Sequence, residues 1–420
     1  MGWREHLADT RPLQEPDFRR LWSANIITVI GAQLTVVAVP AQIYAITKSS
    51  AYVGLTGMFG LVPLVVLGLY GGALADAMDR RRLLLITTVG LIATSALFWA
   101  QAVTDTRNVW LILAIFAVQQ AFFAVNQPTR NALLPRIVSR EQLPAANSLN
   151  MTVTQFGAIA GPLVGGALIP VLGYSWLYLA DTISLGATLW AVVRLPAMPP
   201  VGEVTRAGLR SVLDGLGYLR GNKVLLMSFV VDIIAMTFGM PRALFPQLAH
   251  VSFGGPVDGG LAFALLFAAI PAGAVLGGIF SGWVSRVTRQ GLAVIVSIVV
   301  WGVGITIAGL GAAAAGGGAN PWLWVCLIGL MIGGAADMAS AAFRSTMLQE
   351  AAGDDVRGRL QGVFLVVVAG GPRVADTLHG GVAALAGAPA TAAGGGVLVI
   401  IGVLVASALV PVFVRYRVER

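Results

Sequence analysis

Ionisable side chains within long apolar stretches are the residues of this sequence best placed to do chemistry. A charge at bilayer depth costs several kcal/mol unless it is paired or hydrated, so each is a functional candidate. Asp232 has no opposite charge within four residues along the chain, and burial without a partner disfavours the charged form of a carboxyl group. We therefore expect Asp232 to carry protons, with Asp337 as the second candidate; the alternative for each is an ion pair with Arg373 or Arg242. The full set is Asp181, Asp232, Arg242, Asp337, Arg373, Asp376 and His379.

Arg373 and Asp376 are three residues apart, so they would share one face of a helix and could neutralise each other. Contact with a substrate is an equally good interpretation, and Asp376 is kept as a third proton-coupling candidate.

Amide side chains form the second group of candidates. With Arg242 and Arg373 they predict a cavity for a bulky, moderately polar ligand, although each amide could equally bridge two helices. They are Asn25, Gln33, Gln119, Gln120, Asn126, Asn150 and Gln155.

Motifs for catalysis and for cofactors are absent from the sequence. No G-x-x-x-x-G-K-[ST] loop is present for binding nucleotide phosphates, the three histidines are far apart, and Cys326 is the only cysteine. We therefore expect no enzyme activity, no cofactor, no metal and no intramolecular disulfide.

The elements that must position these residues are membrane-spanning helices. Hydrophobic residues make up 57% of the chain and charged residues 11%, against about 25% charged in a soluble domain. Runs of about 20 apolar residues, enough to cross a bilayer, recur throughout. They predict an all-α integral membrane protein with twelve spans, at 20–46, 51–76, 83–104, 109–129, 146–171, 173–195, 223–248, 259–284, 290–314, 321–345, 360–386 and 392–414.

Basic residues orient these spans. Assigned to alternate loops, 23 of the 27 lysines and arginines fall on one side, which predicts that this side is cytoplasmic and that both termini lie there. The net charge of +8 is then explained by anionic lipid rather than by nucleic acid. The first 20 residues are polar, so no cleavable signal peptide is expected. Arginine outnumbers lysine 25 to 2, which suggests a GC-rich bacterial genome, and we expect a multi-pass protein of the bacterial inner membrane.

The chain divides into an N-terminal half (1–195), a linker (196–222) and a C-terminal half (223–420). In the linker, an apolar stripe from Leu209 to Leu219 flanked by arginines predicts an amphipathic helix on the cytoplasmic leaflet; a disordered linker is the alternative. The halves resemble each other weakly, since Arg130 with Leu134 matches Arg344 with Leu348. Parallel six-helix repeats place a substrate site near the bilayer midplane and work by rocking.

The segment GGALADAMDRRRLLL (71–85) resembles the cytoplasmic loop signature of the major facilitator superfamily, roughly G-x-L-A-D-R-x-G-R-R/K. Ala77 and Asp79 depart from that signature. The resemblance implies the fold of two six-helix bundles and a cytoplasmic gate formed by Gly72, Asp76, Arg80 and Arg81. A purely topogenic role would explain the arginines but not Asp76.

The segment GAIAGPLVGG (157–166) resembles the G-x-x-x-G-P-x-x-G-G motif of drug–proton antiporters, which is associated with exporters. Its glycines would leave a smooth face for close helix packing, and its proline would bend the helix. The matching positions are Gly157, Gly161, Pro162, Gly165 and Gly166.

More specifically, the runs DFRRLW (17–22), VAVPAQIY (37–44), PTRNALLPRIVSREQLPAANSLN (128–150) and VDIIAMTFGMPRALFPQLA (231–249) are similar to the enterobactin-exporter branch. This implies a monomeric secondary transporter in contact with membrane lipid that exports siderophores or amphipathic drugs in exchange for protons. Helix 109–129 lacks the charge that such antiporters usually carry there, and has Gln119 and Gln120 instead. A flippase for lipid-like molecules and an uptake facilitator remain the alternatives.

Overall fold

The computed structural model describes residues 9–199, 217–219, 221–318, 321–351 and 354–417, and no strand occurs among them. Apolar stretches in a bilayer must satisfy their own backbone hydrogen bonds, which a helix does within one segment. The long helices are α1 (Pro16–Thr47), α2 (Ser50–Ala77), α3 (Arg80–Val103), α4 (Val109–Ile137), α5 (Leu143–Val193), α7 (Lys223–Gly239), α9 (Leu261–Ile279), α10 (Gln290–Ala314), α11 (Trp322–Ala351), α12 (Asp354–Ala386) and α13 (Ala388–Leu409). Short turns are η2 (Arg11–Gln14), η3 (Arg242–Leu244), α8 (Phe245–Gln247), η4 (Leu248–Ser252), η5 (Ser281–Arg286) and α14 (Pro411–Val414).

The predicted all-α membrane architecture is confirmed. Within the described residues, ten helices are long and apolar enough to cross a membrane. Helix α5 contains two of the predicted spans and is interrupted at Gly173, whose φ of 76° is outside the helical region and suits a residue without a Cβ atom. Helix α12 covers the predicted span at 360–386. The ten spans are therefore consistent with twelve crossings.

Two helices extend further than predicted. Helix α4 continues to Ile137 and α11 to Ala351, so Arg130, Arg136 and Arg344, which the charge count placed with the cytoplasmic residues, all lie within helices. Arg344 is only 6% exposed. Counting Arg344 as a cytoplasmic residue was therefore wrong, because its side chain is buried within α11.

The helices form two compact units. One comprises the described parts of 1–38, 63–165 and 172–207, and the other those of 39–62, 166–171 and 208–420. The division into sequence halves at 196–222 stays a prediction. The linker residues 200–216 and 220, with most of the predicted amphipathic stripe, lie outside the described residues.

In the first unit, α5 packs directly against α1 through the glycines of the 157–166 motif. A Cβ atom at Gly157 would collide with Val29, and one at Gly161 would collide with the side chain of Gln33. At Gly165 the same atom would lie 2.8 Å from Val37. The contacts advance by four residues on both helices, so the glycines let two backbones approach closely, as small residues do in membranes.

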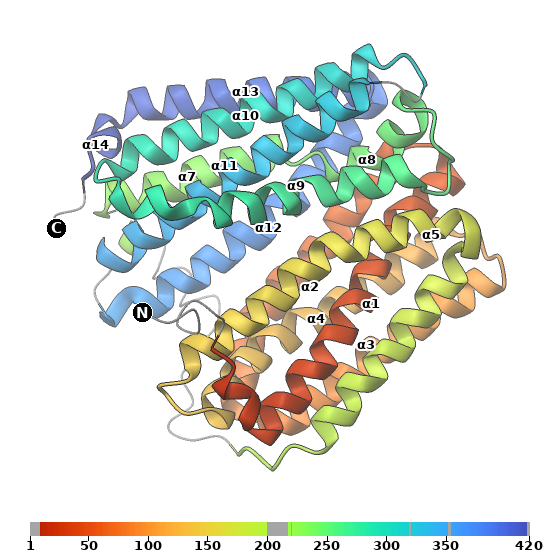
Figure 1. Ribbon diagram of the computed structural model, residues 1–420, viewed down its shortest axis with the longest axis vertical. Helices are drawn as coiled ribbons and strands as arrows, with labels where there is room; N and C mark the ends of the chain where they lie inside the picture. Colours follow the sequence, from red (N-terminus) through yellow and green to blue (C-terminus); the bar gives the residue numbers. More distant parts are fainter. Residues whose placement is uncertain (1–8, 200–216, 220, 319–320, 352–353, 418–420) are drawn as a thin grey trace, which may run out of the picture. The chain divides into compact units, whose positions relative to one another are not determined.

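In the second unit, α10 lies beside α11 and α13, and α11 lies beside α9 (Figure 1). Helix α7 packs against α12 and α13. Trp301 of α10, 1% exposed, donates its indole N–H to the Ala235 carbonyl of α7 at 3.3 Å. Helix α7 is therefore held from several sides, which fixes the position of its acidic residue.

Candidate functional site

A buried ion pair between α7 and α11 lies at the centre of the candidate site. Asp232 is in the interior of α7 and is 1% exposed, while Arg344 is near the end of α11 and is 6% exposed. One guanidinium nitrogen of Arg344 lies 2.5 Å from the Asp232 carboxylate. The premise that Asp232 is buried without a partner was therefore wrong, because its partner comes from a distant helix and is neither Arg242 nor Arg373.

The same arginine faces a second acid. Its other terminal nitrogen lies 4.0 Å from a carboxylate oxygen of Asp337, and its Nε donates to Ser340 Oγ at 3.2 Å. Asp337, Ser340 and Arg344 follow a spacing of three and four residues, which places them on one face of α11. One guanidinium is thus shared between two carboxylates, so the three groups together carry one excess negative charge when all are ionised.

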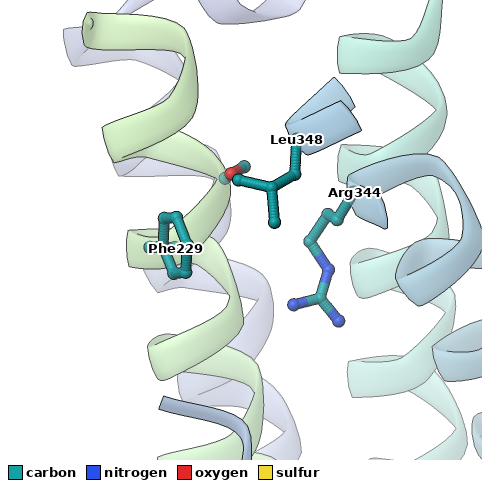
Figure 2. A pocket seen from close by; sticks show the side chains of 4 residues that line it. Phe229, Arg344 and Leu348 are labelled. Carbon is teal, nitrogen blue, oxygen red and sulfur yellow. The ribbon is translucent and has the colours of Figure 1, made fainter. Parts of the chain in front are cut away.

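A small cavity borders this cluster. Figure 2 shows Phe229 of α7 facing Arg344 and Leu348 of α11 across it, and Ser228 completes the lining. Its volume is about 10 Å³, close to the lower limit for one water molecule. Ser228 precedes Asp232 by one helical turn, so a water here would lie next to the ion pair.

The end of α7 forms a second cluster. Pro241 has no N–H to continue the helix, and α7 ends at Gly239, which leaves the Phe238 carbonyl without its helical partner. His379 of α12 is 4% exposed, and its Nε2 lies 3.0 Å from that carbonyl oxygen. Because a carbonyl only accepts, Nε2 carries the hydrogen.

Asp376 and Arg242 connect the two clusters. Asp376 is 8% exposed, and its electrostatic neighbours are Arg373, Arg242 and the backbone N–H of Ala243. Arg242 is exposed at the break after α7 and is also an electrostatic neighbour of Asp337. The structure therefore gathers the proton-coupling candidates Asp232, Asp337 and Asp376 among three arginines in one unit.

The amide candidates lie in the first unit. Asn126, 5% exposed, donates to Thr87 Oγ1 of α3 at 2.8 Å, and this bond connects α4 to α3. Gln33 packs against Gly161, and Gln119 is buried. The others are partly buried, namely Asn25, Gln120, Asn150 and Gln155. Their contact with substrate stays a prediction.

Asp181, the remaining acidic candidate, lies in the first unit. It is 2% exposed and accepts hydrogen bonds from Thr35 of α1 at 2.6 Å and Ser95 of α3 at 2.8 Å. One carboxylate oxygen accepts both bonds, so Asp181 ties three helix segments together.

The 71–85 segment anchors the start of α3. Asp79, which replaces a glycine of the signature, caps α3 by accepting from the Arg82 N–H at 3.0 Å and also accepts from the Met198 N–H at 2.8 Å. Arg80 donates to the Ala132 carbonyl at 2.8 Å and Arg81 to the Val193 carbonyl at 2.6 Å. The side chains of Gly72 and Asp76 lie outside the described residues. An acid directly before a helix is a capping signal, so the role of Asp79 was readable from the sequence.

Apolar helices long enough to cross a membrane, with charged residues buried among them, are typical of multi-pass membrane transporters. The family model described as transmembrane secretion effector matches residues 8–415, and the chain belongs to this family of the major facilitator superfamily. It is a transporter for small molecules and not an enzyme. No group of histidine, cysteine or acidic residues able to hold a metal ion occurs in the described part of the chain.

Relatives and solved structures agree with this assignment. The enterobactin exporter EntS of Shigella boydii is 29% identical over 411 residues, covering 94% of this chain and 92% of that protein. The EntS of Citrobacter koseri is 29% identical over 408 residues, covering 93% and 91%. A crystal structure of a variant of the nucleoside transporter NupG superimposes with a TM-score of 0.76 at 12% identity, covering 94% of this chain and all of that one; this last likeness concerns the fold alone.

Proposed function

We propose that this protein is a secondary active transporter that exports siderophores or similar amphipathic molecules in exchange for protons. The observation that carries the proposal is the sharing of Arg344 between Asp232 at 2.5 Å and Asp337 at 4.0 Å. The two carboxylates and the guanidinium can together bind one extra proton without leaving a buried charge unpaired. A site that couples proton movement to transport requires this property.

The coupling step follows from the geometry. A proton on Asp232 cancels its charge, and Arg344 then has its nearest remaining anion on its own helix, at Asp337. The ion pair between α7 and α11 is thereby replaced by one within α11, so the electrostatic link between the two helices is weakened. Release of the proton restores the link.

Alternating access is supported by a seam within the second unit. The beginning of α2 packs against α8 and α12, where Ser50 donates to Gln247 at 2.6 Å and Thr377 donates to the Gly54 carbonyl at 3.2 Å. A Cβ atom at Gly57 would collide with the Arg373 carbonyl. In the orientation expected from the basic residues, this seam lies at the outer ends of α1 and α2. Alternating access would require these contacts to break whenever the substrate path opens to the outside.

The cargo is proposed from the relatives and from charge. The relatives named above are enterobactin exporters, and Arg242 and Arg373 beside Asp376 supply cationic donors for an acidic, oxygen-rich ligand. The helix-packing motif at 157–166, which resembles that of drug–proton antiporters, favours export.

Transport by purified protein in proteoliposomes tests the proposal. An imposed pH gradient should drive accumulation of a catecholate siderophore, and dissipating the gradient with a protonophore should abolish it. A hydroxamate siderophore and a cationic dye serve as comparison substrates. Movement of a fluorescent phospholipid with no siderophore movement would instead support a flippase, and uptake unaffected by the protonophore would support a facilitator.

A further inference from the structure

A groove on the apolar surface of the second unit plays no part in the proposed transport cycle. It lies between the beginning of α7 and the end of α13, and its volume is about 500 Å³, within the range of pockets that hold whole small ligands. Its apolar walls include Leu226, Val230, Leu409 and Val412, and Lys223 is the one charged residue among the described residues that line it.

The groove exists because the chain leaves the axis of α13. Val410, with φ −128° and ψ 70°, ends the helix, and Pro411 provides no N–H to continue it. The next turn, α14, is held against the start of α10: Phe413 is fully buried and the Tyr416 carbonyl accepts from the Gly291 N–H at 3.4 Å. The departure of the chain toward α10 leaves an open space next to α7.

The walls and the rim suit different parts of one ligand. Leu409 is 78% exposed and Val412 is 58% exposed, so these walls are available to acyl chains. Lys223 is exposed at the rim, and the exposed Arg415 follows α14 directly. Apolar walls that end at cations complement an acyl chain that ends at a phosphate.

We propose that this groove binds an anionic phospholipid, with an acyl chain along Leu226 and Leu409 and its phosphate at Lys223. In the orientation proposed above, the groove opens to the cytoplasmic leaflet, where anionic lipids attract basic residues near the membrane surface. The lipid would brace α13 and α14 against α7. Binding does not depend on which substrate is transported.

The sequence provides an internal control for a test, because it contains only two lysines, Lys48 and Lys223. Lys48 is exposed in the turn between α1 and α2, far from the groove in the sequence. The full-length protein would be placed in nanodiscs of phosphatidylglycerol or phosphatidylcholine and labelled with an amine-reactive ester, and the rate at each lysine would be measured by mass spectrometry.

We expect phosphatidylglycerol to slow labelling of Lys223 about fivefold relative to Lys48, the size of a single lysine–lipid interaction near a surface. Val412→Trp, which fills the groove, should abolish this difference. Val405→Trp should preserve it, because Val405 is 53% exposed on α13 and does not line the groove. Equal slowing of both lysines, or slowing of Lys223 that persists in Val412→Trp, would show only a general surface potential and would overturn the proposal.

Discussion

The shared arginine makes a quantitative prediction about stability. Asparagine in place of Asp232 alone leaves Asp337 within 4.0 Å of Arg344, so the guanidinium keeps one acidic neighbour. Asparagine at both Asp232 and Asp337 removes both acidic neighbours of Arg344, whose side chain is 6% exposed and cannot lose its charge. Removing the partners of a buried charge costs about 3–5 kcal/mol, so the double variant should be destabilised by that amount and Asp232→Asn by clearly less.

A third substitution tests the cause. Adding Arg344→Gln to the double variant removes the uncompensated charge, and neutral replacements of a buried ion pair are often close to neutral in stability. We expect most of the loss to be recovered. The assay is thermal unfolding of the purified protein in detergent, in which the double variant should melt roughly 10 °C below the wild type. A triple variant no more stable than the double variant would refute the electrostatic explanation.

Three further predictions concern packing. Gly57→Ala should separate α2 from α12. A reporter cysteine introduced as Ser50→Cys should then react faster with an external thiol reagent. Gly68→Ala, on the same helix, should not have this effect, because a Cβ atom there would have no other atom within 4 Å. Gly161→Ala should lower both transport and melting temperature because α1 and α5 must separate, whereas Gly186→Ala, also in open space, should leave both unchanged. Asn126→Ala should cost about 1 kcal/mol of stability through its lost bond to Thr87, with the KM for substrate unaltered if the amide only bridges helices; a raised KM would place it in the substrate cavity.

The membrane spans could be predicted from the sequence because about 20 apolar residues are required to cross a bilayer. The interruption at Gly173 was located to within a residue or two, since the spans 146–171 and 173–195 meet there. The smooth face of the 157–166 motif was also expected, and the geometry of Gly157 and Gly161 agrees with it.

Pairing between distant residues could not be predicted in the same way. Asp232 and Arg344 lie on different helices, and nothing in local spacing indicates which of several arginines in the chain an acid will meet. The ends of helices were also missed: Arg344 was counted with the cytoplasmic residues because charge normally marks the end of a span, whereas α11 continues to Ala351. The break after Gly239 was hidden within an uninterrupted apolar run, although Pro241 was a signal for it.

Proton-driven transport by Asp232→Asn tests the central claim most directly. The variant should be produced and should still exchange labelled for unlabelled siderophore across the membrane, but it should not accumulate siderophore in response to a pH gradient. Asp181→Asn is the matched control, because an amide oxygen can still accept from Thr35 and Ser95, and it should retain gradient-driven transport. Gradient-driven accumulation by Asp232→Asn at the wild-type rate would contradict the account.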